Sequence, residues 1–90
     1  MAKAAVDPDE LRRFAVELER TTAEVQNQLM TLQARYKQLG DSWKDQEQAK
    51  FSEVFEQTLR TLSRFVDVSN QHIPYLMRKA QRADEYLRQH

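Results

Sequence analysis

The residues of this chain whose types and spacing come nearest to a catalytic or metal-binding site are two histidines, four serines and one closely spaced pair of glutamates. His72 and His90 have no Glu and no second His three or four positions away, so neither can share a metal ion with a neighbour on one helix face. Glu53 and Glu56 lie three residues apart, a spacing that the charged face of an amphipathic helix explains better than paired catalysis. No base is assembled beside any of the serines, which are Ser42, Ser52, Ser63 and Ser69. We expect no enzymatic activity, no cofactor and no metal site.

Length and composition indicate one small helical domain. The chain has 90 residues, no cysteine, one glycine and two prolines, and its basic and acidic residues balance at 14 each. The charge is spread evenly along the chain, which predicts neither a nucleic-acid-binding patch nor a polybasic membrane anchor. No apolar stretch approaches the roughly 18 residues of a membrane span or the roughly 7–15 of a signal-peptide core. We therefore expect no membrane insertion, and any export to occur without a cleaved signal peptide.

The first half of the chain predicts one long amphipathic helix over about residues 8–39. Asp7 fits the N-cap, Pro8 the first helical position and Glu10 the third position, as in a capping box. Two rows of mostly apolar residues follow, each with a spacing of seven, which is typical of one stripe on a helix. The first row is Leu11, Leu18, Val25, Leu32 and Leu39, and the second is Ala15, Thr22, Leu29 and Tyr36.

The single glycine predicts where this helix ends. Gly40 can adopt the left-handed conformation that closes many helices, and Asp41 or Ser42 can cap the next helix at once. This predicts a corner over residues 40–42 and a second helix over about 43–88, with the only tryptophan in its first turn. A connection this short forces the two helices to run antiparallel.

Proline predicts a change in the second helix. Pro74 removes one helical hydrogen bond and crowds the carbonyl four residues earlier, so we expect a kink near residue 74. Folding the chain at the predicted corner places Pro8 opposite roughly Ile73. Residues 75–90 would then overhang the hairpin, with an apolar face that the first helix does not cover.

The apolar faces are wider than one hairpin can bury. The fold class predicted for residues 1–90 is therefore all-α, an antiparallel two-helix hairpin that dimerises into a four-helix bundle. We expect a homodimer, because both halves of the chain are nearly neutral, with a heterodimer with a homologous hairpin as the other possibility. The residues predicted to form the core and dimer face are Leu18, Val25, Leu29, Leu32, Phe51, Phe55, Leu62 and Phe65.

Two aromatic residues have both a structural and a functional interpretation. Trp43 can seal the closed end of the hairpin, and it can also face a partner, since buried aromatic residues anchor many interfaces. Tyr86 is either a half-exposed residue near a helix end or, beside an uncovered apolar face, a recognition residue.

This layout resembles a known family, the WXG proteins of about a hundred residues, which are early-secreted-antigen-like substrates of type VII secretion. Family members have two long helices joined at a Trp-x-Gly corner, with an aromatic residue eight positions after the Trp. Here Leu39, Trp43 and Phe51 hold the matching positions, and the opening "VDPDEL" is also similar. The resemblance covers nearly the whole chain. It implies a helical hairpin, a dimeric four-helix bundle and export without a signal peptide.

The chain departs from the family pattern at two positions. The corner reads Trp43, Lys44, Asp45, so Asp stands where the family has Gly. The family's carboxy-terminal export signal is Tyr-x-x-x-Asp/Glu, whereas here Tyr86 is followed four residues later by His90. The resemblance implies an export-signal tail that consists of Arg82, Tyr86 and Leu87.

Three functions of different class fit these observations. The first is a non-enzymatic helical hairpin that a type VII-like system exports, as substrate or co-secreted partner, with a secretion ATPase or a larger secreted protein as its partner. The second is a cytoplasmic adaptor or chaperone that binds the helical domain of a larger exported protein. The third is a structural helical dimer unrelated to secretion. The first implies a secreted protein, and the other two a cytoplasmic one.

Overall fold

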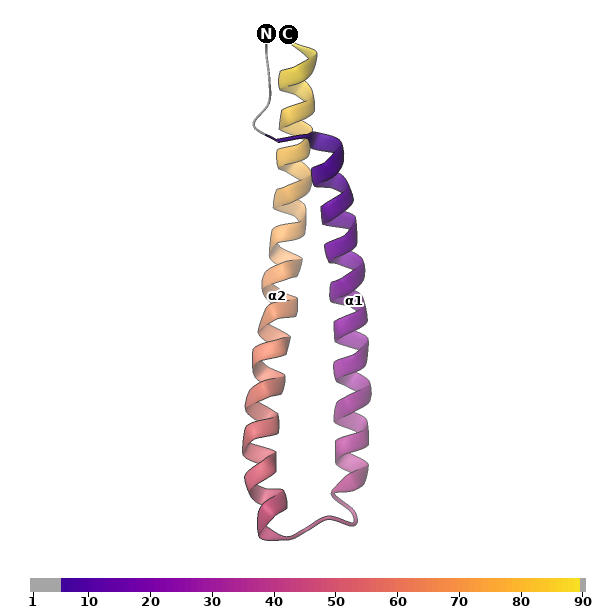
Figure 1. The fold of residues 1–90 in the computed structure, drawn as a ribbon, viewed down its shortest axis with the longest axis vertical. Coiled ribbons are helices and arrows are strands. Elements are labelled where there is room, and N and C mark those ends of the chain that lie inside the picture. Colours follow the sequence, from indigo (N-terminus) through magenta and orange to yellow (C-terminus); the bar gives the residue numbers. More distant parts are fainter. Residues whose placement is uncertain (1–5, 90) are drawn as a thin grey trace.

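The computed structural model describes residues 6–89, which form two long antiparallel helices (Figure 1). Helix α1 spans Pro8–Leu39 and helix α2 spans Gln46–Arg88. The molecule measures 68 × 17 × 14 Å, so it is a rod one helix thick in one direction and two helices thick in the other. The predicted all-α, antiparallel hairpin is confirmed.

Helix α1 begins where its capping residues predict. The Asp7 carboxylate accepts a hydrogen bond from the Asp9 backbone N–H at 2.9 Å, and the Asp7 carbonyl accepts one from Leu11 at 3.0 Å. Pro8 occupies the first helical position, where its missing N–H leaves no hydrogen bond unmade. Asp9 and Glu10 add negative charge near the positive end of the helix dipole.

The corner is longer than the sequence predicts, and glycine closes α1 differently. Gly40 has φ −60° and ψ −19°, so the predicted left-handed conformation is wrong. Instead, the chain tightens into i→i+3 turns. The Asp41 and Ser42 N–H groups donate to the Gln38 and Leu39 carbonyls, both at 3.1 Å. These bonds satisfy the last carbonyls of the helix without any residue at positive φ.

Helix α2 is capped by Asp45, not by Asp41 or Ser42. The Asp45 carboxylate accepts a hydrogen bond from the Gln48 N–H at 2.9 Å, and Asp45 has the extended backbone of an N-cap. The predictions that the corner ends at residue 42 and that Trp43 lies in the first turn of α2 are therefore wrong. Trp43 lies in the connection, where its N–H donates to the Leu39 carbonyl at 2.9 Å.

Two rows of side chains form the contact between the helices, and we call them the seam. The Tyr36 and Ser52 hydroxyls hydrogen-bond across it, and Leu29 packs with Leu59 and Val66, which fixes the register of α1 against α2. Steps of seven from these contacts account for most of the buried residues of both helices. The buried seam residues are Pro8, Ala15, Thr22 and Leu29 in α1, and Leu59, Val66, Ile73 and Ala80 in α2.

This register corrects the predicted overhang. Pro8 is level with Ala80, not Ile73, because the six-residue connection shifts α2 by about two turns. Arg12 accordingly pairs with Asp84. The last turns of α2, beyond Ala80, extend past the start of α1 (Figure 1). Helix α2 also continues without a break through Pro74, which is exposed, so water can satisfy the carbonyl that Pro74 leaves without a donor.

The capping geometry predicts different effects for two nearby aspartates. Asp45→Ala removes the side chain that caps α2 and should lower the free energy of unfolding by about 1 kcal/mol. Asp41→Ala removes an exposed carboxylate with no capping bond and should change the free energy by less than about 0.5 kcal/mol. Urea denaturation of both variants at one protein concentration provides the comparison. A larger effect at Asp41 would contradict the corner described here.

Candidate functional site

One side of the hairpin carries a second pair of apolar rows next to the seam, and we call it the open face. On α1, the predicted row that begins at Leu11 is half-buried near the start of the helix and exposed at Leu32 and Leu39. On α2, the open face continues through Phe51, Leu62 and Phe65, which are 37–44% exposed. Val54, Val68 and Tyr75 are exposed as well, but each follows a seam position by two residues and so lies about 160° from the seam around α2.

A groove of about 650 Å³ runs along the middle of the open face. Its floor and walls combine Val25, Leu29 and Leu32 of α1 with Leu62 of α2, so both helices present apolar rows to the same side. Thr21, Gln28 and Arg35 form its polar rim. The groove has the shape and chemistry to accept an apolar side chain from another helix.

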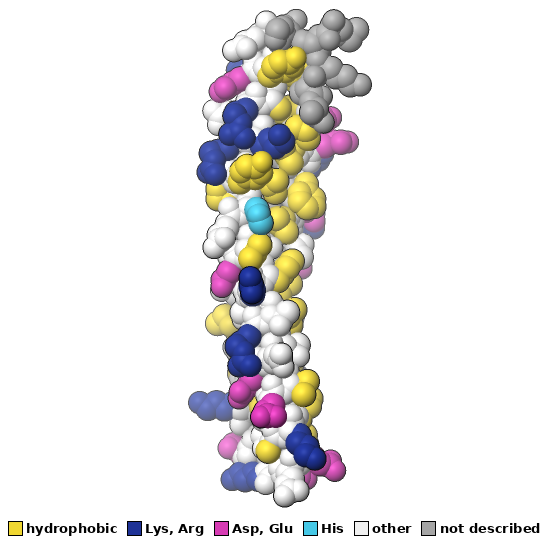
Figure 2. Space-filling view, turned by 90° about the vertical axis from the view of Figure 1, so that its left-hand side faces the viewer, with side chains coloured by type: hydrophobic (Ala, Val, Ile, Leu, Met, Phe, Trp, Pro, Cys, Tyr) yellow, Lys and Arg dark blue, Asp and Glu magenta, His cyan; other side chains and the backbone are white. Residues whose placement is uncertain are grey.

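The opposite side of the hairpin is polar. A groove on that side is smaller, about 380 Å³, and charged or amide side chains dominate its lining, including Gln33, Arg60 and Asp67. Viewed from the α2 side, the molecule shows hydrophobic side chains gathered mainly along the middle and right of its upper half, whereas most Lys and Arg side chains lie toward the left and Asp and Glu lie at both edges (Figure 2). The hairpin is thus amphipathic as a whole, with one side suited to water and one to a partner.

The predicted core and dimer residues divide between the seam and the open face. Leu29 is buried in the seam, and Leu18, Val25 and Phe55 are half-buried at its edge. The other four are exposed on the open face, at 37–46%: Leu32, Phe51, Leu62 and Phe65.

An aromatic cluster fills the closed end of the hairpin. Phe51 is central to it, with ring centroids 5.9 Å from Trp43, 5.8 Å from Tyr36 and 5.5 Å from Phe55. The Gln48 side-chain amide donates to the Tyr36 hydroxyl at 3.1 Å and to Ser52 at 2.9 Å. Trp43 is half-buried, so it packs on its own chain and still presents part of its ring to the surroundings.

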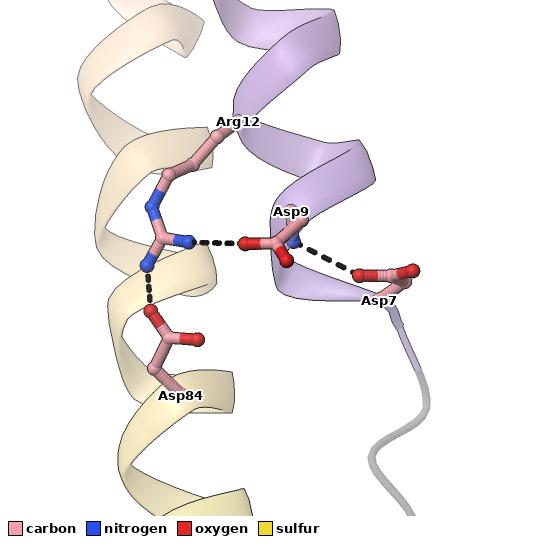
Figure 3. Close-up of polar contacts among 4 residues, drawn as sticks. All are labelled: Asp7, Asp9, Arg12 and Asp84. Carbon is pink, nitrogen blue, oxygen red and sulfur yellow. Dashed lines mark hydrogen bonds and ion pairs between the residues drawn. The ribbon is translucent and has the colours of Figure 1, made fainter.

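An ion-pair clasp joins the two helices at the end of the hairpin where α1 begins and α2 ends (Figure 3). The Arg12 guanidinium binds Asp84 of α2 through one nitrogen and Asp9 of α1, at 3.2 Å, through another. Asp84 is therefore engaged in holding the end of α2 against the start of α1. No sequence pattern predicts the pairing of Arg12 with Asp84, because the two residues are 72 positions apart in the chain.

The tail and the corner lie at opposite ends of one chain. Arg82, Tyr86 and Leu87 are exposed on the last turns of α2, whereas Trp43, Lys44 and Asp45 form the connection at the other end. The rod is 68 Å long, so a single copy does not bring corner and tail together. His90 lies outside the described residues.

Two polar side chains are buried between the helices: Thr22 lies in the seam, and Ser69 lies three residues after the seam residue Val66. Thr22 is 1% exposed and Ser69 is 5% exposed, and the Thr22 hydroxyl has no hydrogen-bond partner. A buried hydroxyl without a partner costs stability, so the seam alone is not an optimised core. The sequence indicated Thr22 as the one polar residue of its row, but it gave no comparable warning for Ser69.

Within residues 6–89, no group of three or more His, Cys, Asp or Glu side chains could hold a metal ion. In the same part of the chain, neither helix combines the length and apolar character that a membrane crossing requires.

Two of the four serines make hydrogen bonds that support the structure. Ser42 donates to the Leu39 carbonyl at 3.2 Å, and Ser52 belongs to the Tyr36 network.

A family profile decides the relationship of this chain to known proteins. The profile described as "Proteins of 100 residues with WXG", the WXG100 family, matches residues 3–85. The chain belongs to the WXG100 family. The WXG100 proteins are small helical proteins associated with type VII secretion, and dimerisation into a four-helix bundle is typical of them.

Solved structures of WXG100 relatives agree with this assignment. The chain is similar to the secreted protein EsxB from Bacillus anthracis, in its wild-type form and as a single-residue mutant. In both comparisons the identity is 27% and the TM-score is 0.75, covering 96% of this chain and 89% of EsxB. Among curated proteins, none matches the chain.

The clasp predicts a local effect on the end of α2. Asp84→Asn keeps the size of the side chain but removes its charge, and since the pair is partly exposed the free energy of unfolding should fall by less than about 1 kcal/mol. Amide hydrogen exchange in residues 80–88 should nevertheless become faster. Glu17→Gln, which breaks the exposed pair with Arg20, is the control and should leave that exchange unchanged. Equal exchange in the two variants would contradict a clasp.

Proposed function

We propose that this protein is a non-enzymatic substrate or co-secreted partner of a type VII-like secretion system and that it acts as a homodimer. The observation that carries the proposal is the match to the WXG100 family over residues 3–85, together with the likeness to the secreted protein EsxB. The open face adds a physical reason for a helical partner, because its apolar side chains cannot all be covered by one hairpin.

Surface area supports dimerisation. The chain exposes 7373 Å², whereas a compact monomer of its mass, 10.7 kDa, exposes roughly 5,500 Å². The excess of roughly 1,900 Å² is more than the roughly 800 Å² that each partner buries in a standard interface. Pairing two open faces in a four-helix bundle would remove much of this excess from water.

We propose that the export signal combines the corner of one copy with the tail of the other. Trp43 and Tyr86 lie at opposite ends of one rod, and an antiparallel dimer brings the corner of one copy beside the tail of its partner. Asp84 cannot supply the acid that the family has after Tyr86, because Arg12 already binds it. Glu85, which is exposed, is the remaining acidic residue beside Tyr86 in the described chain.

We also propose that Asp45 preserves the family corner in spite of its departure from Trp-x-Gly. Asp45 is the N-cap of α2, a position at which Asp and Gly are both accepted. In this interpretation the third position of the motif requires a residue that starts a helix, and Asp meets this requirement through its carboxylate.

Export measured beside stability tests the proposal. Tyr86→Ala, expressed with a type VII system, should reduce the secreted amount about tenfold or more. The melting temperature should change by only a few degrees, because Tyr86 is 42% exposed. Arg88→Ala, at an exposed position two residues further along the same helix end, is the matched control and should be exported normally.

Normal export of Tyr86→Ala would contradict the role of the tail. If the wild-type protein instead stays inside cells that have an active type VII system, and is bound there to a larger exported protein, the adaptor function would be favoured.

A further inference from the structure

We propose that the outer face of α2, the side of this helix that points away from the seam, is a docking surface for an amphipathic helix of a different protein, one whose apolar row is bordered by Asp or Glu. The outer face consists of two rows of exposed residues that lie two positions before and two positions after the seam positions of α2, about 160° from the seam on either side. The first row is Lys50, Gln57, Arg64, Gln71 and Arg78, and the second is Val54, Thr61, Val68, Tyr75 and Arg82.

The second row of the outer face is apolar along most of its length. Val54, Val68 and Tyr75 are 62%, 39% and 47% exposed. Thr61, which lies between the two valines, donates its hydroxyl to the Gln57 carbonyl at 3.1 Å, so its donor is already satisfied. The row from Val54 to Tyr75 is about 32 Å long. Apolar side chains repeated every seven residues are the pattern with which one helix packs along another.

The first row makes the outer face positively charged. Lys50, Arg64 and Arg78 recur every 14 residues, or about 21 Å, with glutamines between them, and Arg82 adds a cation where the apolar row ends. Neither row contains an Asp or Glu between residues 50 and 82. Within the described part of the chain, none of these cations makes an ion pair. Acidic residues on an approaching helix would supply their counter-ions.

The corresponding side of α1 shows that exposure to water does not by itself produce this pattern. Glu10, Glu17 and Glu24 lie in one of its rows and Arg13 and Arg20 in the other, so both signs of charge are mixed. Arg20 binds Glu17 at 2.8 Å on the same helix. Neither row contains a large apolar residue. The outer side of α1 is thus typical of a solvated face, whereas the outer face of α2 combines an apolar row with one sign of charge.

The charges decide against a second copy of this chain as the occupant. Two outer faces in contact would place cations against cations, which is unfavourable. The outer side of α1 carries acids but offers no apolar row to cover Val54, Val68 and Tyr75. A nucleic acid backbone would neutralise the cations and leave the same apolar side chains in water. A helix with an apolar row and bordering acids matches both rows of the outer face.

The outer face remains available when the open face is covered, so this inference does not depend on the proposed homodimer. The α2 residues of the open face, Phe51, Leu62 and Phe65, lie about 60–100° from the seam, whereas the outer face lies about 160° from it. Figure 2 looks onto α2 and shows hydrophobic side chains along the middle of its upper half, with most Lys and Arg side chains to the left. A dimer formed through the open face would carry one outer face on each copy.

A designed peptide tests the chemistry of this surface. The probe is a helical peptide of about 28 residues, long enough to form a helix, with Leu at a spacing of seven and Glu beside each Leu row position. Its counterpart has Lys in place of every Glu. In fluorescence anisotropy at low salt, the Glu peptide should bind the full-length protein at least about tenfold more tightly than the Lys peptide.

Charge reversal on the protein should exchange this preference. The double variant Arg64→Glu, Arg78→Glu should bind the Lys peptide more tightly than the Glu peptide. Arg13→Glu with Arg20→Glu, the same change of charge on α1, is the matched control and should keep the preference for the Glu peptide. Equal binding of the two peptides by the wild-type protein, or the same result for both double variants, would overturn the inference.

Single cysteines locate the bound peptide, because the natural chain contains no cysteine. A peptide with one Cys in its Leu row should form a disulfide with Val68→Cys and not with Leu32→Cys on the open face. Crosslinking to Leu32→Cys alone would overturn the placement on the outer face. A monomer in sedimentation of the chain alone would overturn the homodimer and leave this inference standing.

Photocrosslinking in the cells that produce the protein tests the natural occupant. A photoreactive residue in place of Val68 should form an adduct with a helical segment of another protein in which acids border an apolar row. The same residue in place of Asn27, on the outer side of α1, should not form that adduct. An adduct with a second copy of this chain, an adduct with a segment that lacks the bordering acids, or no adduct at position 68 would each overturn the inference.

Discussion

Two helices that touch along one line bury one row of side chains from each completely and a second row only in part, and this constraint determines the rest of the structure. Both helices carry a second apolar row about 60° from the first, since positions three residues apart on a helix differ by about that angle. The first rows meet in the seam. The second rows, with Val25 and Leu62 among them, remain on one side of the hairpin and need a further partner.

The seam is too small and too polar to stabilise the hairpin by itself. Ala15 and Ala80 are fully buried but contribute little apolar area, Thr22 is polar, and Ser69 is a further buried polar residue next to the seam. A chain of this length is marginal even with a well-packed core. We therefore expect folding and association to be linked in this protein, with features such as the Asp45 cap and the Arg12 clasp holding the hairpin in the geometry that a partner must meet.

The periodicity of the sequence predicted the fold well, because Leu11 and its row repeat every seven residues and Asp7 and Pro8 mark the start of α1. It failed at the corner, where Gly40 permits several conformations and Asp41, Ser42 and Asp45 are all competent caps. Only the tertiary structure selects among them. That error of three residues moved the residue opposite Pro8 from Ala80 to Ile73, and so made the predicted overhang about seven residues too long.

The sequence predicted which residues belong to the candidate site better than it predicted the contacts that they make. The aromatic residues Trp43 and Phe51 were identified from their spacing and from the family pattern. Arg12 and Asp84 were not paired, because an ion pair between distant residues depends on the register of the helices. The groove between Val25 and Leu62 could not be predicted from the sequence either, since its shape depends on how far apart the two helices pack.

Thermal unfolding followed by circular dichroism over a hundredfold range of protein concentration tests the linkage of folding and association most directly. If the second apolar rows are covered only by a partner, the melting temperature should rise by about 5–10 °C across that range, since association stabilises the folded chain by mass action. A single hairpin that keeps full helicity and a melting temperature independent of concentration would contradict this account.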